Sequence, residues 1–220
     1  ISKNKLLKFM NKIDVSIDMD VGLDLLKKDE KMNFLINKFG IPVFDIKKDY
    51  FQSLLRYIVN QQLSGKSAKA IYERFINLIP KNTLISPKEV IKLSKDDMRM
   101  AGLSFQKIDY LKNLSNYFVK NSFQKEDVKK MTDQEICKEL TQIKGIGQWT
   151  VDMFLMFTLN RPDVMPYGDL GIQKGYKKIY NMSNLPLKKE MENGSKIWKP
   201  YRTLACWYLW KMADEEDFVW

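Results

Sequence analysis

The sequence predicts an all-α fold, and three observations lead to that prediction. Nearly every segment carries apolar residues at the three- and four-residue spacing of an amphipathic helix. Capping residues stand where those helices should begin. Runs of alternating Val, Ile and Thr that are long enough for β-strands are scarce. We therefore expect helices along the whole chain.

The first expected helices follow from their capping residues. Ser64 or Ser67 can begin one helix, and Ser86 can begin the next. Ser94 can begin a short helix that Gly102 ends. In each case the serine hydroxyl can accept a hydrogen bond from a free backbone N–H group of the first turn.

The segment 132–147 predicts a helix that leads into a tight hairpin. Thr132 and Glu135 form a capping-box pattern ahead of apolar residues at helical spacing. A second, apolar helix begins near Gln148. The glycines of Lys144-Gly145-Ile146-Gly147 allow a sharp turn, and the free N–H groups of the second helix point back at it. The hairpin could bind an anion, although an ordinary helix–helix turn is the simpler interpretation of these residues alone.

A single carboxylate stands at the start of the following helix. Arg161-Pro162-Asp163 ends the apolar helix, and Pro166-Tyr167-Gly168-Asp169 opens the next one. Asp169 is therefore expected near the hairpin, where it can also serve as an ordinary N-cap. Asp163 fits a turn or an ion pair better. Asp152 lies inside an apolar helix and is expected to pair with a lysine or arginine.

Composition limits the chemistry that this chain can perform. The 220 residues are 45% hydrophobic, enough for one domain or two small lobes with a core. The formal charge of +10 favours a polyanionic partner. Two cysteines and no histidine exclude most zinc sites and catalytic triads, so carboxylates must carry any chemistry. Because we find neither a membrane-spanning segment nor a signal peptide, we expect a soluble, intracellular protein without a membrane partner.

Several ordered blocks of the sequence carry a family pattern. Residues 140–171 contain the hairpin, Trp-Thr, an apolar helix, Arg-Pro-Asp and Pro-x-x-Asp-Leu-Gly. Further blocks stand at 60–66, 102–107 and 198–210. Together they resemble the helix-hairpin-helix DNA glycosylases, and most closely the AlkA-type 3-methyladenine DNA glycosylases, over about residues 45 to 213. Such a set is more specific than a lone Gly-x-Gly.

The resemblance implies two helical lobes with the active cleft between them. Residues 45–155 would form the lobe that contains the helix-hairpin-helix motif. Residues 156–220 would form the C-terminal lobe that carries the catalytic aspartate. Residues 1–44 would be an N-terminal helical segment that packs with the C-terminal lobe. The resemblance implies no cofactor, and we expect a monomer.

The resemblance also implies a base-excision repair enzyme that hydrolyses the N-glycosidic bond of alkylated purines, 3-methyladenine and 7-methylguanine, in duplex DNA. Asp169 would stabilise the oxocarbenium-like sugar and orient water. Trp149 occupies the position at which strand-cutting members of the family have a lysine, so no lyase step is expected. Trp149, Trp210 and Tyr57 would form the base pocket, because ring faces attract cationic bases by about 0.5–2 kcal/mol.

DNA contacts are implied at two loops. The hairpin would hold a phosphate, and its carbonyls could bind a monovalent cation, whereas no side chains suggest a metal site. The loop that begins at Gln61 would fill the gap left by the extruded base, with Leu63 or Ser64 as the wedge. Lys69, Lys107 and Lys174 are further phosphate candidates. The predicted DNA-binding residues are Gln61, Gln62, Leu63, Ser64, Lys66, Lys144, Gly145, Ile146, Gly147 and Thr150.

Two alternatives remain open at this point. One is a glycosylase/lyase for oxidised purines, which Trp149 disfavours because an indole cannot form a Schiff base. The other is a non-catalytic helix-hairpin-helix module that binds DNA, which Asp169 disfavours. The sequence does not fix the range of damaged bases. The protein should work where DNA lies: in the nucleus of a eukaryote, or in the cytoplasm and nucleoid of a bacterium.

Overall fold

A computed structural model describes residues 17–44, 49–63, 65–80, 83–121, 123 and 125–213. Within these ranges the chain is helical and contains no β-strand, which confirms the predicted all-α class. The helices are α2 Met19–Leu26, α3 Glu30–Phe39, α4 Tyr50–Asn60, α5 Gly65–Ile76, α6 Pro87–Lys92, α7 Lys95–Met100, α8 Phe105–Lys120, α9 Lys125–Lys130, α10 Asp133–Leu140, α11 Gln148–Phe157, α12 Leu170–Ile179, α13 Lys188–Gly194, the short 3₁₀ helix η1 Ser195–Trp198, and α14 Arg202–Ala213.

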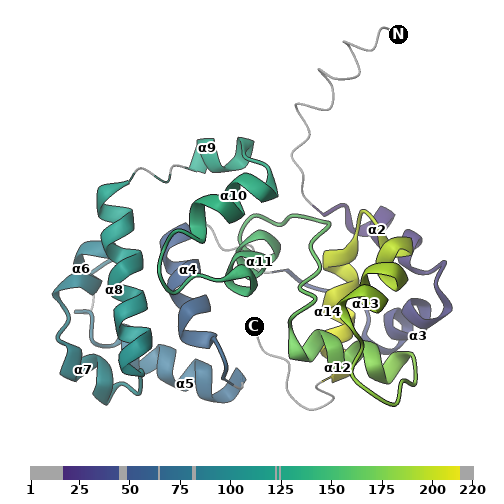
Figure 1. Cartoon of the computed structure of the whole chain (residues 1–220), viewed down its shortest axis with the longest axis horizontal. Coiled ribbons are helices and arrows are strands. Elements are labelled where there is room, and N and C mark those ends of the chain that lie inside the picture. Colours follow the sequence, from purple (N-terminus) through teal and green to yellow (C-terminus); the bar gives the residue numbers. More distant parts are fainter. Residues whose placement is uncertain are drawn as a thin grey trace, which may run out of the picture.

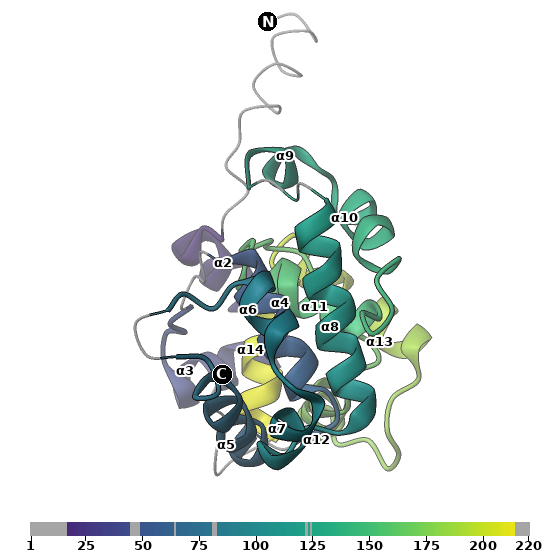
Figure 2. The same cartoon turned by 90° about the vertical axis from the view of Figure 1, so that its left-hand side faces the viewer.

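The helices form two lobes (Figure 1). Helices α4 to α10 form the first lobe, in which α8 packs against α4, α6 and α7 (Figure 2). Helices α12 to α14 form the second lobe, and α2 and α3 from the beginning of the chain pack against α14. Helix α11 contacts α4 and α10 and lies between the two lobes. The second lobe is thus assembled from segments far apart in the sequence.

Local capping signals set the helix starts that the sequence predicted. The hydroxyls of Ser86 and Ser94 accept hydrogen bonds from the first turns of α6 and α7. Thr132 and Glu135 form the predicted capping box at the start of α10. Gly102, with φ of 101°, follows α7 at its C-terminal end. Ser64, the alternative cap for α5, lies outside the described residues.

Helices α12 and α14 approach closely at a glycine. A Cβ atom on Gly175 would lie only 2.0 Å from the backbone oxygen of Leu209. Any larger residue at this position would therefore push the two helices apart. The contact matters because α12 begins next to Asp169 while Trp210 lies on α14.

The loop before α12 is fixed to the start of α14 by an ion pair. Both Nε and Nη2 of Arg202 donate to the carboxylate of Asp163, at 2.6 and 2.9 Å. Arg202 also donates through Nη1 to the hydroxyl of Tyr167, at 2.9 Å. This bidentate geometry is the strong form of an arginine–carboxylate pair. It confirms that Asp163 is an ion-pair residue and holds the segment that leads to Asp169.

Helix α11 is buried on nearly all sides, and its one acidic residue is buried with it. Asp152 is 8% exposed and accepts a hydrogen bond from Nε2 of Gln148, one turn earlier, at 2.8 Å. Among the described residues no lysine or arginine forms an ion pair with Asp152, so the predicted pairing is wrong. Burial raises the pKa of Asp152 to about 6, and the carboxylates of Asp169 and Asp133 add to the rise.

None of the helices in the described ranges combines the length and the apolar character needed to cross a bilayer.

The first prediction concerns Asp152→Asn. Folding raises the pKa of Asp152 from 3.8 to about 6, so the folded protein keeps a proton that the unfolded chain loses within this window. The wild-type carboxyl therefore costs stability as the pH rises through the window, up to about 3 kcal/mol above it. Asparagine can still accept from Gln148 and carries no charge. Urea unfolding should show Asp152→Asn more stable than wild type at pH 7.5, with this difference lost near pH 3, below the pKa of the unfolded chain. An equal difference at both pH values would contradict the assignment.

The second prediction concerns Gly175→Ala. The new methyl group would overlap the carbonyl of Leu209, so we expect a loss of about 1–3 kcal/mol in the free energy of unfolding. Alanine otherwise favours helices by up to about 1 kcal/mol over glycine, which makes a loss informative. The control is Gly168→Ala, because a Cβ atom there meets nothing within 4 Å. Thermal unfolding of both variants checks the prediction, and a stabilised Gly175→Ala would refute it.

Candidate active site

A cleft of about 1720 Å³ separates the two lobes and contains most of the predicted site residues. Its walls come from α4 and α5, from the hairpin before α11, and from the beginning of α12 and the end of α14. The predicted residues that line it are Gln61, Gln62, Leu63, Lys66, Gly145, Ile146, Gly147, Trp149, Thr150, Asp169 and Trp210.

Asp169 is held in this cleft by three N–H donors. Its Oδ1 accepts from the backbone N–H of Ile172 at 2.9 Å, which makes Asp169 the N-cap of α12. The same oxygen accepts from the indole Nε1 of Trp210 at 2.8 Å. Its Oδ2 accepts from the indole Nε1 of Trp149 at 2.6 Å. The carboxylate is therefore fixed in orientation, and one acceptor position on Oδ2 remains by count.

The two tryptophans reach Asp169 from different helices, α11 between the lobes and α14 in the second lobe. Trp149 lies on the first turn of α11, directly after the hairpin, and is half-buried. Trp210 lies near the end of α14 and is 3% exposed. A Cβ atom on Gly171 would lie 2.7 Å from the ring of Trp210, so a glycine is needed for this approach. The sequence predicted both rings for the base pocket but not their bonds to the carboxylate.

The hairpin has the backbone geometry that its glycines suggested. Gly145 has φ of 110°, and a Cβ atom there would lie 2.2 Å from the ring of Tyr110. Ile146 is 5% exposed and anchors the turn in the core. Gly147 caps α11 without a side chain, and a Cβ atom there would meet nothing within 4 Å. The start of α11 is therefore open to an anion that binds its free N–H groups.

Several carbonyls of the hairpin already accept hydrogen bonds. Asn113 donates to the carbonyl of Lys144 at 3.3 Å, and Gln61 donates to that of Gly145 at 2.9 Å. The carbonyl of Gly147 accepts from the backbone N–H groups of Thr150 and Val151 in the first turn of α11. The proposed monovalent cation on these carbonyls stays a prediction. The side chain of Lys144 is exposed and does not line the cleft.

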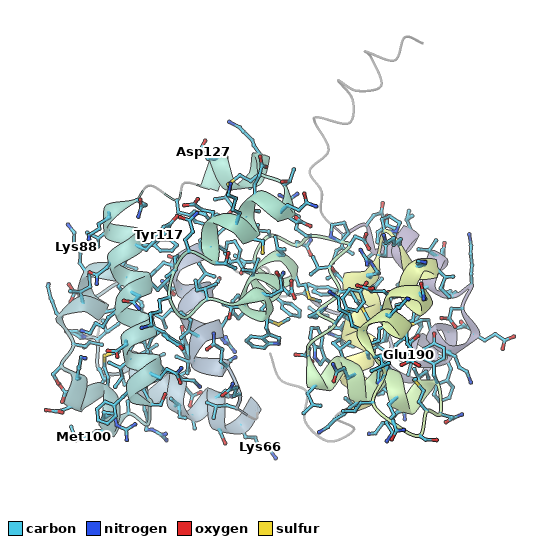
Figure 3. The ribbon with its side chains drawn as sticks, in the orientation of Figure 1. Lys66, Lys88, Met100, Tyr117, Asp127 and Glu190 are labelled. Atoms are coloured by element: carbon cyan, nitrogen blue, oxygen red, sulfur yellow. The ribbon has the colours of Figure 1, made fainter. Side chains whose placement is uncertain are left out.

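The predicted wedge loop follows α4 and lines the cleft from the first lobe, whereas Asp169 lines it from the second. Gln62 has φ of 57°, an unusual value for a residue other than glycine. Leu63 follows it and is 38% exposed, with its side chain lining the cleft. Lys66 lies at the end of α5 nearest the second lobe (Figure 3). Ser64 lies outside the described residues, so nothing distinguishes it from Leu63 as the wedge.

Gln61 and Lys107 make bonds within the protein. The Nε2 atom of Gln61 donates to the carbonyl of Gly145 and, at 2.8 Å, to Oγ1 of Thr150. The Nζ atom of Lys107 donates to the carbonyls of Val59 and Gln61, at 2.7 and 2.8 Å. Both N–H bonds of the Gln61 amide and two of the three on Lys107 Nζ are therefore used within the protein.

Tyr57 lies apart from the other predicted pocket residues. It is 3% exposed, and its hydroxyl shares a hydrogen bond with Thr158 at 3.0 Å. It does not line the cleft, so the structure places this ring in the core of the first lobe. Among the lysines, Lys69 lines the cleft, whereas Lys174 is exposed on α12 away from it.

Sequence reasoning missed two residues that shape the site. Tyr110 on α8 supports the hairpin through its contact with Gly145 and also lines the cleft. Gly171 admits the ring of Trp210. The signal for Gly171 was present, because it follows Asp169 within the family pattern. No local signal links Tyr110 to a turn 35 residues later.

The described residues contain no group of three or more cysteine or acidic side chains placed to hold a metal ion.

Comparisons with known proteins agree on one family. Residues 55–200 match the HhH-GPD superfamily base excision DNA repair proteins. The chain is 39% identical over 174 residues to DNA-3-methyladenine glycosylase 1 of Schizosaccharomyces pombe. The aligned residues make up 79% of this chain and 76% of that protein.

Two solved structures have the same fold. One is the 3-methyladenine DNA glycosylase of Schizosaccharomyces pombe in complex with abasic DNA, with a TM-score of 0.83 and 35% identity over 90% of this chain and 98% of that one. The other is a DNA-3-methyladenine glycosidase from Bacillus halodurans, with a TM-score of 0.71 and 37% identity over 86% of this chain and 87% of that one. The chain belongs to the HhH-GPD superfamily of base excision DNA repair proteins.

Proposed function

We propose that this protein is a monofunctional DNA glycosylase that hydrolyses the N-glycosidic bond of alkylated purines, 3-methyladenine and 7-methylguanine, in duplex DNA. The observation that carries the proposal is the Asp169 carboxylate, fixed by two indole N–H groups inside a cleft that also contains the hairpin. The names of the similar proteins from Schizosaccharomyces pombe and Bacillus halodurans support the substrate class.

When the leaving base is already cationic, hydrolysis of its glycosidic bond needs few catalytic groups. Bond cleavage then produces a neutral base and an oxocarbenium-like sugar, so no general acid is needed. A carboxylate placed beside the anomeric carbon stabilises the developing positive charge. The acceptor position that remains on Oδ2 of Asp169 can orient the attacking water. The product is an intact strand with an abasic site.

The two indole rings suit a base that carries positive charge. The face of an aromatic ring attracts a cation by about 0.5–2 kcal/mol, and the face of tryptophan attracts it most strongly. Trp149 and Trp210 both donate to Asp169, so their indole edges lie beside the carboxylate that would act on the sugar. A flipped alkylated purine could therefore stack near the same carboxylate that acts on its glycosidic bond.

DNA would be held by the hairpin and the wedge loop. The open N-terminus of α11 at Gly147 can bind a phosphate without reading sequence. Leu63 supplies an apolar side chain at the edge of the cleft for the gap that the extruded base leaves. Lys66 and Lys69 add positive charge to the same cleft. We propose that the protein acts on damaged double-stranded DNA as a monomer, inside the cell.

No lyase step is expected, because the position directly after the hairpin holds Trp149, whose indole cannot form a Schiff base. Lysines line other parts of the cleft, and borohydride trapping tests whether any of them attacks the sugar. We expect that borohydride traps no covalent complex between the protein and DNA that contains a damaged base or an abasic site.

The third prediction concerns Asp169→Asn. Removing the carboxylate charge should lower single-turnover release of 7-methylguanine by at least about 100-fold. Asparagine remains a good N-cap, so α12 should stay folded. Released bases are identified by chromatography after incubation with methylated duplex DNA. The control is Asp109→Asn, which removes an exposed acid that pairs with Lys95. Full base release by Asp169→Asn would refute the proposed mechanism.

The fourth prediction separates the indole N–H groups from the rings. Trp149→Phe and Trp210→Phe each keep a ring but remove one donor to Asp169, so base release should fall by about 10-fold in each variant. Trp207→Phe on α14 is the matched control, because Trp207 does not line the cleft. Single-turnover kinetics on the same methylated duplex measure all three. Equal activity of Trp207→Phe and Trp210→Phe would show that the indole bond to Asp169 is dispensable.

A further inference from the structure

Two DNA-contact elements of this protein are joined by a short chain of hydrogen bonds. The first element is the wedge loop after α4, and the second is the hairpin before α11. Gln61 spans them, because its Nε2 donates both to the carbonyl of Gly145 at 2.9 Å and to Oγ1 of Thr150 at 2.8 Å. An amide nitrogen has two hydrogens, so both are used within the protein.

Lys107 holds the backbone of Gln61 from the opposite side. Its Nζ donates to the carbonyls of Val59 and Gln61. These carbonyls lie at the C-terminal end of α4, where no later turn of the helix supplies an N–H donor. The ammonium group is half-buried, and this burial lowers the pKa of Lys107. A lysine whose ammonium group donates to two carbonyls fixes that backbone position with two of its three N–H bonds.

Helix α8 supports the hairpin as well. Tyr110 lies one turn after Lys107 on this helix, and its ring fills the space beside Gly145. The same helix face therefore holds the loop through Lys107 and the hairpin through Tyr110. We call the set Lys107, Gln61, Gly145 and Thr150 the loop–hairpin tie.

The loop needs such support because little else fixes it. Gln62 adopts a left-handed backbone conformation, which is unfavourable for a residue with a side chain. Leu63 bonds back to the carbonyl of Asn60 at 3.2 Å, and its side chain is exposed. A strained, exposed loop keeps one conformation only when neighbouring groups hold it.

We propose that Gln61 and Lys107 are positioning residues that make the wedge loop and the hairpin one rigid unit, so that gripping a phosphate places the wedge for base extrusion. This inference rests on the proposed glycosylase function and names the step at which these residues act. A loop fixed in advance does not lose conformational entropy when it inserts into the duplex. The loop–hairpin tie thus lowers the free energy of extrusion and leaves the bond cleavage at Asp169 unchanged.

The test compares paired and unpaired lesions. A 7-methylguanine opposite cytosine must be extruded against its base pair, whereas the same base opposite an abasic site is extruded at lower cost. The variants are Gln61→Glu, which has the same shape but lacks the amide donor, and Lys107→Met. Each should lower single-turnover release from the paired lesion by about 10-fold, the effect of one or two lost hydrogen bonds. Release from the unpaired lesion should change by less than about 3-fold, since extrusion there needs less help.

The chain offers a matched control on the same helix. Lys112 likewise donates from α8 to three carbonyls, those of Val90, Ile91 and Leu93, and its pKa is also lowered by burial. It does not line the cleft. Lys112→Met should lower thermal stability as Lys107→Met does, without altering the ratio of rates on paired and unpaired lesions.

A second readout measures extrusion without chemistry. In the Asp169→Asn background, 2-aminopurine beside the lesion should brighten on binding, and adding Gln61→Glu should reduce this rise. Equal losses on paired and unpaired lesions, or no loss on either, would overturn the role of the loop–hairpin tie. A wild-type protein that releases no base from either duplex would instead overturn the proposed function, and the fluorescence rise would still report on the loop–hairpin tie.

Discussion

The hydrogen bonds of Asp169 with two tryptophans are the constraint on which the rest of the site depends. Trp149 comes from the helix that follows the hairpin, and Trp210 comes from the last helix of the opposite lobe. The carboxylate at the start of α12 therefore joins α11, which follows the hairpin, to α14 of the second lobe. A change in the relative position of the lobes would break at least one of these bonds. The distance between the hairpin and the Asp169 carboxylate is therefore set by packing.

That packing is concentrated at a few contacts behind the cleft. Gly175 lets α12 lie against α14, and Gly171 admits the ring of Trp210 beside Asp169. The Arg202–Asp163 ion pair fixes the loop that enters α12. Gly171 lines the cleft beside Asp169, whereas the other contacts act on the position of Asp169 from outside the cleft lining. Substitutions at these residues should therefore reduce activity through geometry, with stability falling in parallel.

Residue patterns within one helical turn predict where the helices begin. They do not predict which side chains from distant parts of the chain bond to one another. The caps at Ser86, Ser94, Thr132 and Asp169 follow from residue types within one turn, and the structure has all four. The partner of Asp152 was predicted wrongly, because a buried carboxylate can be satisfied by a neighbouring amide and a raised pKa as well as by a cation. The bonds of Gln61 cross 84 and 89 residues, a separation at which sequence spacing carries no information.

The choice of indoles to hold Asp169 also has an electrostatic reason. Among the described residues no lysine or arginine forms an ion pair with this carboxylate, although the chain carries 37 of them. A cationic partner would orient the acid equally well but would cancel the negative charge that a sugar cation needs. An indole N–H fixes the orientation and leaves the net charge in place. The two indoles can thus position the acid without neutralising it.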